Sequence, residues 1–176
     1  MKHELELLQK RKKYKDYIDE HRKYVKLAFD NFKRLKCNAL SKEELLLLTN
    51  EVENHDMSKY GLEEFEAYRI HFFPCTFENK DDAKEDFEFA KKHHYLVNDH
   101  HPQNPTRKEG LNKVACIHNI IDWIAMSYKF NDSIWQFYEN SGIGEKLNTV
   151  EREFVEEILD LIKTQRELFY KEEIER

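Results

Sequence analysis

The stretch LELLQKRKKYKDYIDEHRKYVKLAFDNFKRLKC, residues 5–37, repeats its apolar side chains at the 3.6-residue period of an amphipathic α-helix. This spacing predicts one long helix from about Leu5 to Cys37, with its apolar face turned toward a core. His21 falls on that face, so we expect it to be buried. The apolar residues that set the period are Leu5, Leu8, Tyr14, Tyr17, Ile18, Tyr24, Val25, Ala28, Phe32 and Leu35.

Capping and turn residues divide the rest of the chain into further helices. Ser41 with Glu44 matches a capping box, and Asn148 with Glu151 is a similar pair. Two prolines make residues 100–105 a loop, and glycines predict a turn at residues 141–144. The later helices are expected at about Lys42–Asn54, Leu62–Phe73, Asp81–Val97 and Asn112–Phe130, then a short one capped by Asp132 or Ser133 and a last one from Asn148 to about Ile174.

The composition indicates a single all-α domain. Charged residues make up 36% of the 176 residues, against about 25% in ordinary globular chains. Only four glycines and three prolines are present, whereas β-proteins need many turns. We therefore expect one domain over residues 1–176, an all-α bundle of about six to seven helices.

Charge and hydropathy exclude several classes of protein. The net charge is −6, so no nucleic-acid groove is evident, and the basic run at residues 10–13 fits a solvated helix face. No stretch of about 18 apolar residues is available to span a membrane. The first residues do not match a secretory signal, and three widely spaced cysteines do not suggest a disulfide framework. These features favour a cytoplasmic protein and leave its oligomeric state open.

Histidines and carboxylates stand where they could bind metal ions. His21 lies on a buried face, where an imidazole must be hydrogen-bonded to a neighbour or bound to a metal. His55 and Asp56 are adjacent at a predicted helix end, and such a carboxylate can bridge two ions. Lys59 follows four residues after His55, where an ammonium suits a phosphate, although a surface lysine is the simpler alternative.

A second set of candidate ligands lies farther along the chain. The segment HHYLVNDHH, residues 93–101, holds four histidines in nine residues, and His-rich tracts often bind metals. His94 and His101 are seven residues apart, so they face one way if the helix continues. Asp122 lies in the apolar run IIDWI, where a carboxylate is costly unless it is paired or bound to a metal.

Other known templates are absent from the sequence. There is no HExxH motif, no Glu-x-x-His pair, no Gly-rich phosphate loop and no GxSxG motif. These absences argue against zincins, di-iron bundles, nucleotide-binding loops and serine hydrolases.

The order His21, His55-Asp56, Lys59, a His cluster and Asp122 resembles the HD superfamily of metal-dependent phosphohydrolases, over roughly Lys10–Asn131. That superfamily is all-helical, so the resemblance implies an HD-domain-like bundle. The sequence HDMSK resembles the HDxGK motif of the cyclic-dinucleotide phosphodiesterase branch. It is more similar to a group of small bacterial and phage proteins, without an assigned activity, that carry HDxSK and NxHH motifs.

The resemblance implies a set of ligands and roles. His21, His55, Asp56 and Asp122 would bind a first metal ion, and Asp56 would bridge to a second ion held by His94, His100 or His101. Lys59 would bind phosphate. The Gly of HDxGK is Ser58 here, Tyr17 stands where some members have a ligand Glu, and the GYP element is absent. These differences argue against a third metal and a cyclic-dinucleotide substrate.

We therefore expect a metal-dependent phosphohydrolase that acts on a nucleotide or another small phosphate ester through a metal-activated water. One or two divalent transition-metal ions, Fe, Mn, Ni, Co or Zn, would be the cofactor. Asp56 and Lys59 would serve catalysis, and Glu64 could assist proton transfer, although a surface or capping carboxylate is the stronger alternative for it. Two other readings stay open: a metal-binding module without catalysis, regulatory or phage-related, and a structural bundle without metal.

Overall fold

The computed structural model describes residues 2–107 and 110–169. Within these ranges the chain forms seven α-helices and three short 3₁₀ helices, and no strand. The prediction of an all-α bundle of six to seven helices is confirmed.

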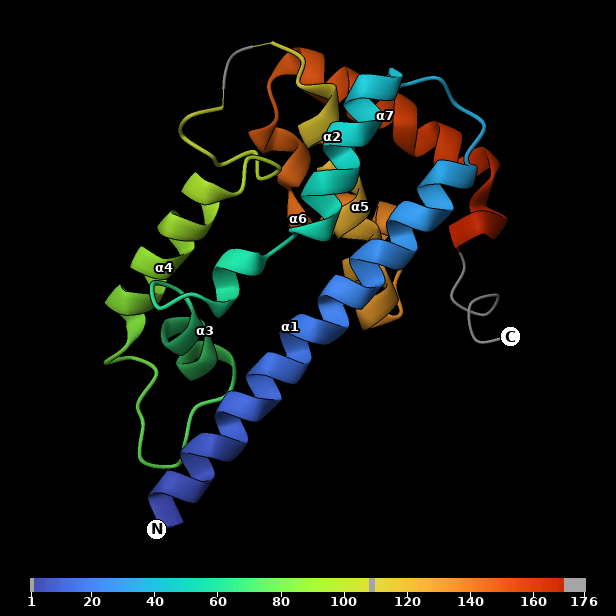
Figure 1. Cartoon of the computed structure of the whole chain (residues 1–176). Coiled ribbons are helices and arrows are strands. Elements are labelled where there is room, and N and C mark those ends of the chain that lie inside the picture. Colours follow the sequence, from blue (N-terminus) through green and yellow to red (C-terminus); the bar gives the residue numbers. More distant parts are fainter. Residues whose placement is uncertain (1, 108–109, 170–176) are drawn as a thin grey trace.

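Helix α1, Lys2–Arg34, is the long helix predicted from the sequence, and it runs along the whole molecule (Figure 1). Its apolar face is buried at the expected period from Tyr14 and Ile18 to Val25 and Phe32, whereas Leu5 and Leu8, predicted to share that face, are exposed. His21 is only 5% exposed, as predicted. It lies between the two stretches of α1 that enter two different cores.

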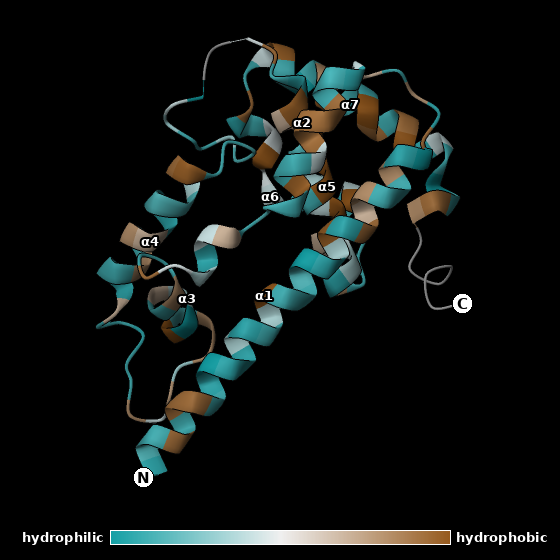
Figure 2. Cartoon of the chain, in the orientation of Figure 1, coloured by the Kyte–Doolittle hydropathy of each residue, from teal (hydrophilic) through white to brown (hydrophobic). Residues whose placement is uncertain are grey.

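The large core lies along the C-terminal half of α1. Helix α5, Lys113–Phe130, contacts α1, α2 (Lys42–Glu53), α6 (Ile134–Ser141) and α7 (Thr149–Thr164). Because neighbours surround it, α5 is buried on nearly all sides, which its apolar sequence permits. Figure 2 shows hydrophobic ribbon concentrated where α2, α5 and α7 meet. The 3₁₀ helices η2, Ile143–Lys146, and η3, Arg166–Phe169, complete this half.

The small core lies against the N-terminal half of α1. The 3₁₀ helix η1, Met57–Tyr60, contacts α3, Phe65–Phe72, and α4, Lys84–Val97. Its buried apolar side chains are those of Tyr14, Ile18, Tyr68 and Ala90. The segment between α2 and η1, which contains His55 and Asp56, therefore passes from the large core to the small one.

Local capping confirms several predicted helix starts. Ser41 and Glu44 form both hydrogen bonds of a capping box at α2. Of the two candidates for α6, it is Ser133 that caps the helix, with its own capping box. Asn148 caps α7 by accepting a hydrogen bond from the Glu151 backbone amide.

Several predicted boundaries are wrong. Helix α1 begins at Lys2 and ends at Arg34, and not at Leu5 and Cys37. Helix α3 begins at Phe65 and not near Leu62, because residues 62–64 form a turn that buries Glu64. Helix α4 begins at Lys84, after a further turn. Helix α7 ends at Thr164, because the chain then bends so that Leu168 and Phe169 pack on the large core. The predicted helical residues 170–174 lie outside the described part of the chain.

The structure also bears on membrane and redox properties. None of the helices in the described ranges combines the length and apolar character that crossing a bilayer needs. The cysteines Cys37, Cys75 and Cys116 are all free, and the last two are buried.

Candidate metal centre

The first ligand group consists of His21, His55, Asp56 and Asp122, and its ligand atoms converge from α1, the end of α2 and α5. His21 Nε2 lies 3.0 Å from His55 Nε2 and 3.0 Å from Asp122 Oδ1. Asp56 Oδ2 lies 3.6 Å from His21 Nε2 and 3.5 Å from His55 Nε2. His21 and His55 are 34 positions apart in the sequence, and Asp56 and Asp122 are 66 apart. Their side chains nevertheless meet in space, as predicted.

The backbone at Asp56 places this residue at the junction. Asp56 has φ 57° and ψ 19°, in the left-handed region that few residues other than glycine adopt and that Asp tolerates better than most. Arg22 fixes the preceding turn from α1 by donating hydrogen bonds to the carbonyl oxygens of His55, at 2.9 Å, and Glu53, at 2.7 Å. A non-glycine residue held in this conformation often belongs to a functional site.

The second ligand group consists of Asp56, His94 and His101. Asp56 Oδ1 lies 3.3 Å from His94 Nε2, and His94 Nε2 lies 2.9 Å from His101 Nε2. His94 comes from the last turn of α4 and His101 from the segment that follows it. The two carboxylate oxygens of Asp56 therefore face two different groups of imidazoles.

Glu64 lies behind the second ligand group. Its carboxylate is fully buried and accepts hydrogen bonds from His93 Nδ1 at 2.8 Å and His94 Nδ1 at 2.9 Å. Because Nδ1 of His94 donates to Glu64, its Nε2 is left with a lone pair directed at Asp56 and His101. Glu64 thus orients a candidate ligand, and its predicted role in proton transfer stays a prediction.

Ser58 and Asn98, the distinctive residues of the HDxSK and NxHH motifs, contact each other beside His94. Asn98 Nδ2 donates to Ser58 Oγ at 3.0 Å and to the His94 carbonyl oxygen at 2.8 Å. Ser58 Oγ lies 3.3 Å from His94 Nδ1. A glycine at position 58 would lack this contact, so the serine and the asparagine form a matched pair.

Lys59 reaches the first ligand group from η1. Its Nζ lies 2.6 Å from Asp56 Oδ2 and 5.6 Å from the centre of the Tyr68 ring. Burial disfavours the ammonium, but the Asp56 carboxylate outweighs this effect and raises the pKa of Lys59. Lys59 is therefore a cation at neutral pH, and its side chain keeps 20% of its surface exposed.

His100 packs against His118 and His55. Its ring centre is 4.2 Å from that of His118 and 4.9 Å from that of His55. It also belongs to a group with His101 and Asp122 whose ligand atoms lie within 4.8 Å of one another. His100 therefore lies near residues of both ligand groups, as Asp56 does.

Sequence reasoning passed over His118 as a functional candidate. The signal was present, because His118 stands one helical turn before Asp122 and shares its face of α5. His118 is 2% exposed, as buried as the predicted ligands.

Burial and neighbouring charge leave four of these residues, His55, His101, Asp56 and Asp122, in the protonation states that bind metals. Burial lowers the pKa of His55 to about 3 and that of His101 to about 4. Burial opposes ionisation of Asp56, but electrostatic interactions with the neighbouring His55 imidazole and the Lys59 ammonium hold the pKa of its carboxyl well below the usual value. A hydrogen bond to His21 likewise lowers the pKa of Asp122 against the effect of burial. Neutral imidazoles and ionised carboxylates are the required ligand forms.

The donor set fits a divalent metal ion. Asp56 Oδ1 is buried and has no hydrogen-bond partner in the described part of the chain. An ionised oxygen in such surroundings is costly unless a cation satisfies it. Imidazole and carboxylate ligands suit first-row transition metals. The buried His and Asp groups could therefore hold a metal ion, with His21, His55 and Asp56 in one group and Asp56, His94 and His101 in another.

Comparison with known proteins gives a family for the chain. A family model described as a family of unknown function, DUF5662, matches residues 10–163. The chain belongs to this family. The DUF5662 match includes every residue of both ligand groups and continues through most of α7. Comparison with curated proteins and with solved structures finds no match.

Proposed function

We propose that this DUF5662 protein is a metal-dependent phosphohydrolase of the HD type, which acts on a nucleotide or another small phosphate ester. The observation that carries the proposal is the position of Asp56. Its Oδ2 faces His21 and His55 at 3.6 and 3.5 Å, and its Oδ1 faces His94 at 3.3 Å. A carboxylate in this position is suited to bridge two ions.

One ion would be held by His21, His55, Asp56 and Asp122, and a second by Asp56, His94 and His101, with His100 able to join it. Fe, Mn, Ni, Co or Zn fits these ligands. When bound, such ions polarise phosphoryl oxygens and lower the pKa of a coordinated water. Among these ligands, burial lowers the pKa of the His55 and His101 imidazoles, and the carboxyls of Asp56 and Asp122 have pKa values below the usual range.

Lys59 would bind the phosphate of the substrate. Its ammonium stands 2.6 Å from Asp56 Oδ2, at the partly exposed side of the first ligand group. From this position an ammonium can hold a phosphoryl oxygen that the ions leave free. Because Lys59 stays charged at neutral pH, it can stabilise the negative charge of the phosphate throughout hydrolysis.

We also propose that the protein acts in the cytoplasm. Three free cysteines, two of them buried, suit a reducing compartment. No basic surplus points to a nucleic-acid partner, since the net charge is −6.

The proposal is tested by metal analysis and by hydrolysis of a substrate panel. Protein loaded with each metal in turn is assayed against a phosphodiester, a phosphomonoester and a set of nucleotides. The variant Asp56→Ala should lose metal and activity together, because Asp56 directs one carboxylate oxygen to each group. Lys59→Ala should keep its metal but bind phosphate about 1.5–3 kcal/mol more weakly, a loss of roughly 10- to 150-fold. The exposed lysine Lys23 provides the control, and Lys23→Ala should match wild type.

The outcomes separate the rival readings. Bound metal without hydrolysis of any member of the panel would favour a binding module that kept the site without the chemistry. Absence of metal from purified and reconstituted protein would favour a structural bundle. Loss of metal from Lys59→Ala would show that the role given to Lys59 is wrong, even if hydrolysis stands.

A further inference from the structure

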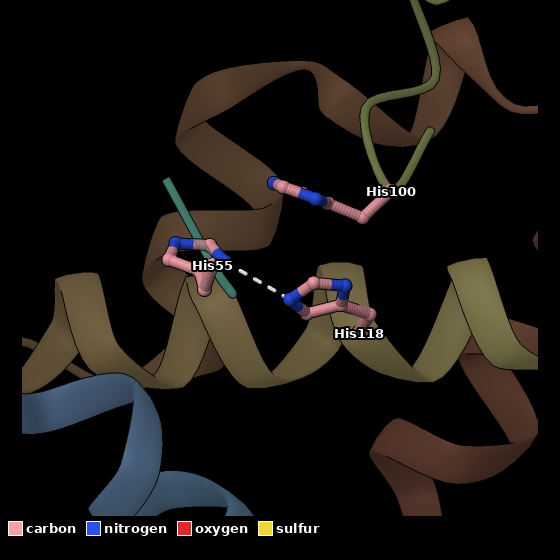
Figure 3. A group of neighbouring side chains, drawn as sticks. All are labelled: His55, His100 and His118. Carbon is pink, nitrogen blue, oxygen red and sulfur yellow. Dashed lines mark hydrogen bonds between the residues drawn. The ribbon is translucent and has the colours of Figure 1, made fainter. Parts of the chain in front are cut away.

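His55 has a second partner on the side that faces away from the first ligand group. Its Nδ1 lies 2.9 Å from Nε2 of His118, the contact drawn as a dashed line in Figure 3. Both rings are buried, with 1% and 2% of their surfaces exposed. His118 comes from α5, whereas His55 follows α2, so this contact joins two elements of the large core.

Glu51 on α2 sets the direction of the hydrogen bonds that link it to His118 and His55. Its Oε2 lies 3.3 Å from His118 Nδ1. An ionised carboxylate can only accept, so His118 donates from Nδ1 and its Nε2 carries a lone pair. That lone pair accepts the Nδ1 hydrogen of His55, and Nε2 of His55 is therefore left unprotonated, where it faces His21 and Asp122 at 3.0 and 3.7 Å.

We propose that His118 and Glu51 are positioning residues that hold His55 in the tautomer and orientation needed to bind the first ion. The inference rests on the proposed metal site. It adds two residues that would not themselves bind the metal ion. A metal-binding histidine usually donates its other nitrogen to such a partner, and loss of that partner weakens metal binding by about 10–100-fold. Here the carboxylate acts through an intervening imidazole.

The surroundings of His118 support a polar role over simple packing. The neighbouring positions on α5 include Ile117, Ile120 and Ile121, all fully buried. A buried polar ring among them costs free energy unless both of its nitrogens are satisfied. The ring centre of His100 lies 4.2 Å from that of His118, so a third imidazole packs against this pair (Figure 3).

The three rings could instead hold an ion of their own, because His55, His100 and His118 each offer one nitrogen within 4.8 Å of the others. A neutral imidazole carries one lone pair, and His55 directs its lone pair at the first ligand group from Nε2, so its Nδ1 donates to His118 rather than binding a second ion. The number of ions bound by variants decides between these arrangements.

The test uses cobalt and zinc titrations of His118→Leu, His118→Gln and Glu51→Gln, with Glu53→Gln as a control on an exposed residue of the same helix. His118→Leu should bind the same number of ions but the tightest one roughly 10–100-fold more weakly, with a changed cobalt absorption spectrum. His118→Gln should recover part of the affinity, because its amide oxygen can accept from His55 Nδ1. The metal affinity of Glu51→Gln should lie between those of wild type and His118→Leu, and the affinity of Glu53→Gln should equal that of wild type.

A second measurement reads the tautomer of His55 in metal-free protein by ¹⁵N NMR of the imidazole nitrogens. Wild type and His118→Gln should carry the hydrogen on Nδ1, and His118→Leu, if folded, should show a mixture. An Nε2-protonated His55 in wild type, or unchanged cobalt affinity and spectrum in a folded His118→Leu, would overturn the proposal. If His118→Leu binds one metal ion fewer than wild type and holds the remaining ions with unchanged affinity, the rings of His55, His100 and His118 bind an ion of their own. If wild type binds no metal, the proposed function fails, and the NMR result still decides the hydrogen-bond chain.

Discussion

The two cores support the two sides of Asp56 by different means. The large core contains 21 buried apolar residues in the described part of the chain and the small core four, so packing fixes the helices of the first far more firmly. Three of the four residues in the first ligand group lie on or directly after α2 and α5, which the large core holds. The second group adds His94 from α4 and His101 from the irregular segment behind it.

Polar contacts take over where apolar packing is scarce. The segment that carries His100 and His101 is anchored by Arg107, which pairs with Glu151 of α7 at 2.8 Å and donates to the His100 carbonyl oxygen. Arg69 of α3 pairs with Glu78 in the connection to α4. Ion binding by the second group should therefore be weaker and depend more on these anchors than binding by the first.

The largest expected difference is in metal content. His21→Ala should lose the tightly bound ion, because His21 is central to the first group, at 3.0 Å from both His55 and Asp122. His101→Ala should keep that ion and lose only the weaker one. Metal analysis after dialysis and titration with zinc would measure both. Equal losses of metal in the two variants would mean that the two ligand groups form one cooperative site. That result would contradict the difference in affinity expected between the groups.

The next effect concerns the anchor of the His101 segment. Arg107 and Glu151 have side chains only 6% and 3% exposed. Arg107→Met leaves a buried carboxylate without its partner, so the free energy of unfolding should fall by about 3–5 kcal/mol. The double variant with Glu151→Leu should recover much of that loss, since no charge is then left buried. Urea unfolding measures both, and a loss below about 1 kcal/mol in Arg107→Met would show that the anchor is unimportant.

A smaller, pH-dependent effect is expected from Glu78. Hydrogen bonds from Arg69 lower the pKa of Glu78 from its ordinary 4.5 to about 2. Because the folded pKa is below the unfolded one, the stabilisation is complete above about pH 4.5 and is lost as the pH falls toward 2. Glu78→Gln should cost about 1.5–3 kcal/mol at pH 7, and its difference from wild type should narrow in acid. Urea unfolding from pH 7 to 3 measures this, with the exposed Glu85→Gln as a control. A gap that does not change with pH would mean that the Glu78 charge is irrelevant to stability.

Sequence patterns identified the helices and most of the candidate ligands. The period of α1 placed His21 on a buried face, and the capping box at Ser41 fixed the start of α2 and so the position of His55 at its end. These features depend on residues three or four apart, whose interactions one helix contains. The same local reasoning extended α7 too far, because the bend after Thr164 depends on packing against the large core.

The sequence by itself determined the all-α class, the burial of His21 and the presence of His and Asp residues suited to a metal. Only the tertiary structure decided which of them face each other. It put His94 and His101 at one oxygen of Asp56 and His100 beside His118, and it turned Glu64 toward His94. The reason is physical: helical periodicity is set within a few residues, whereas the meeting of α1, α2, α4 and α5 at one carboxylate depends on how two cores pack across the whole chain.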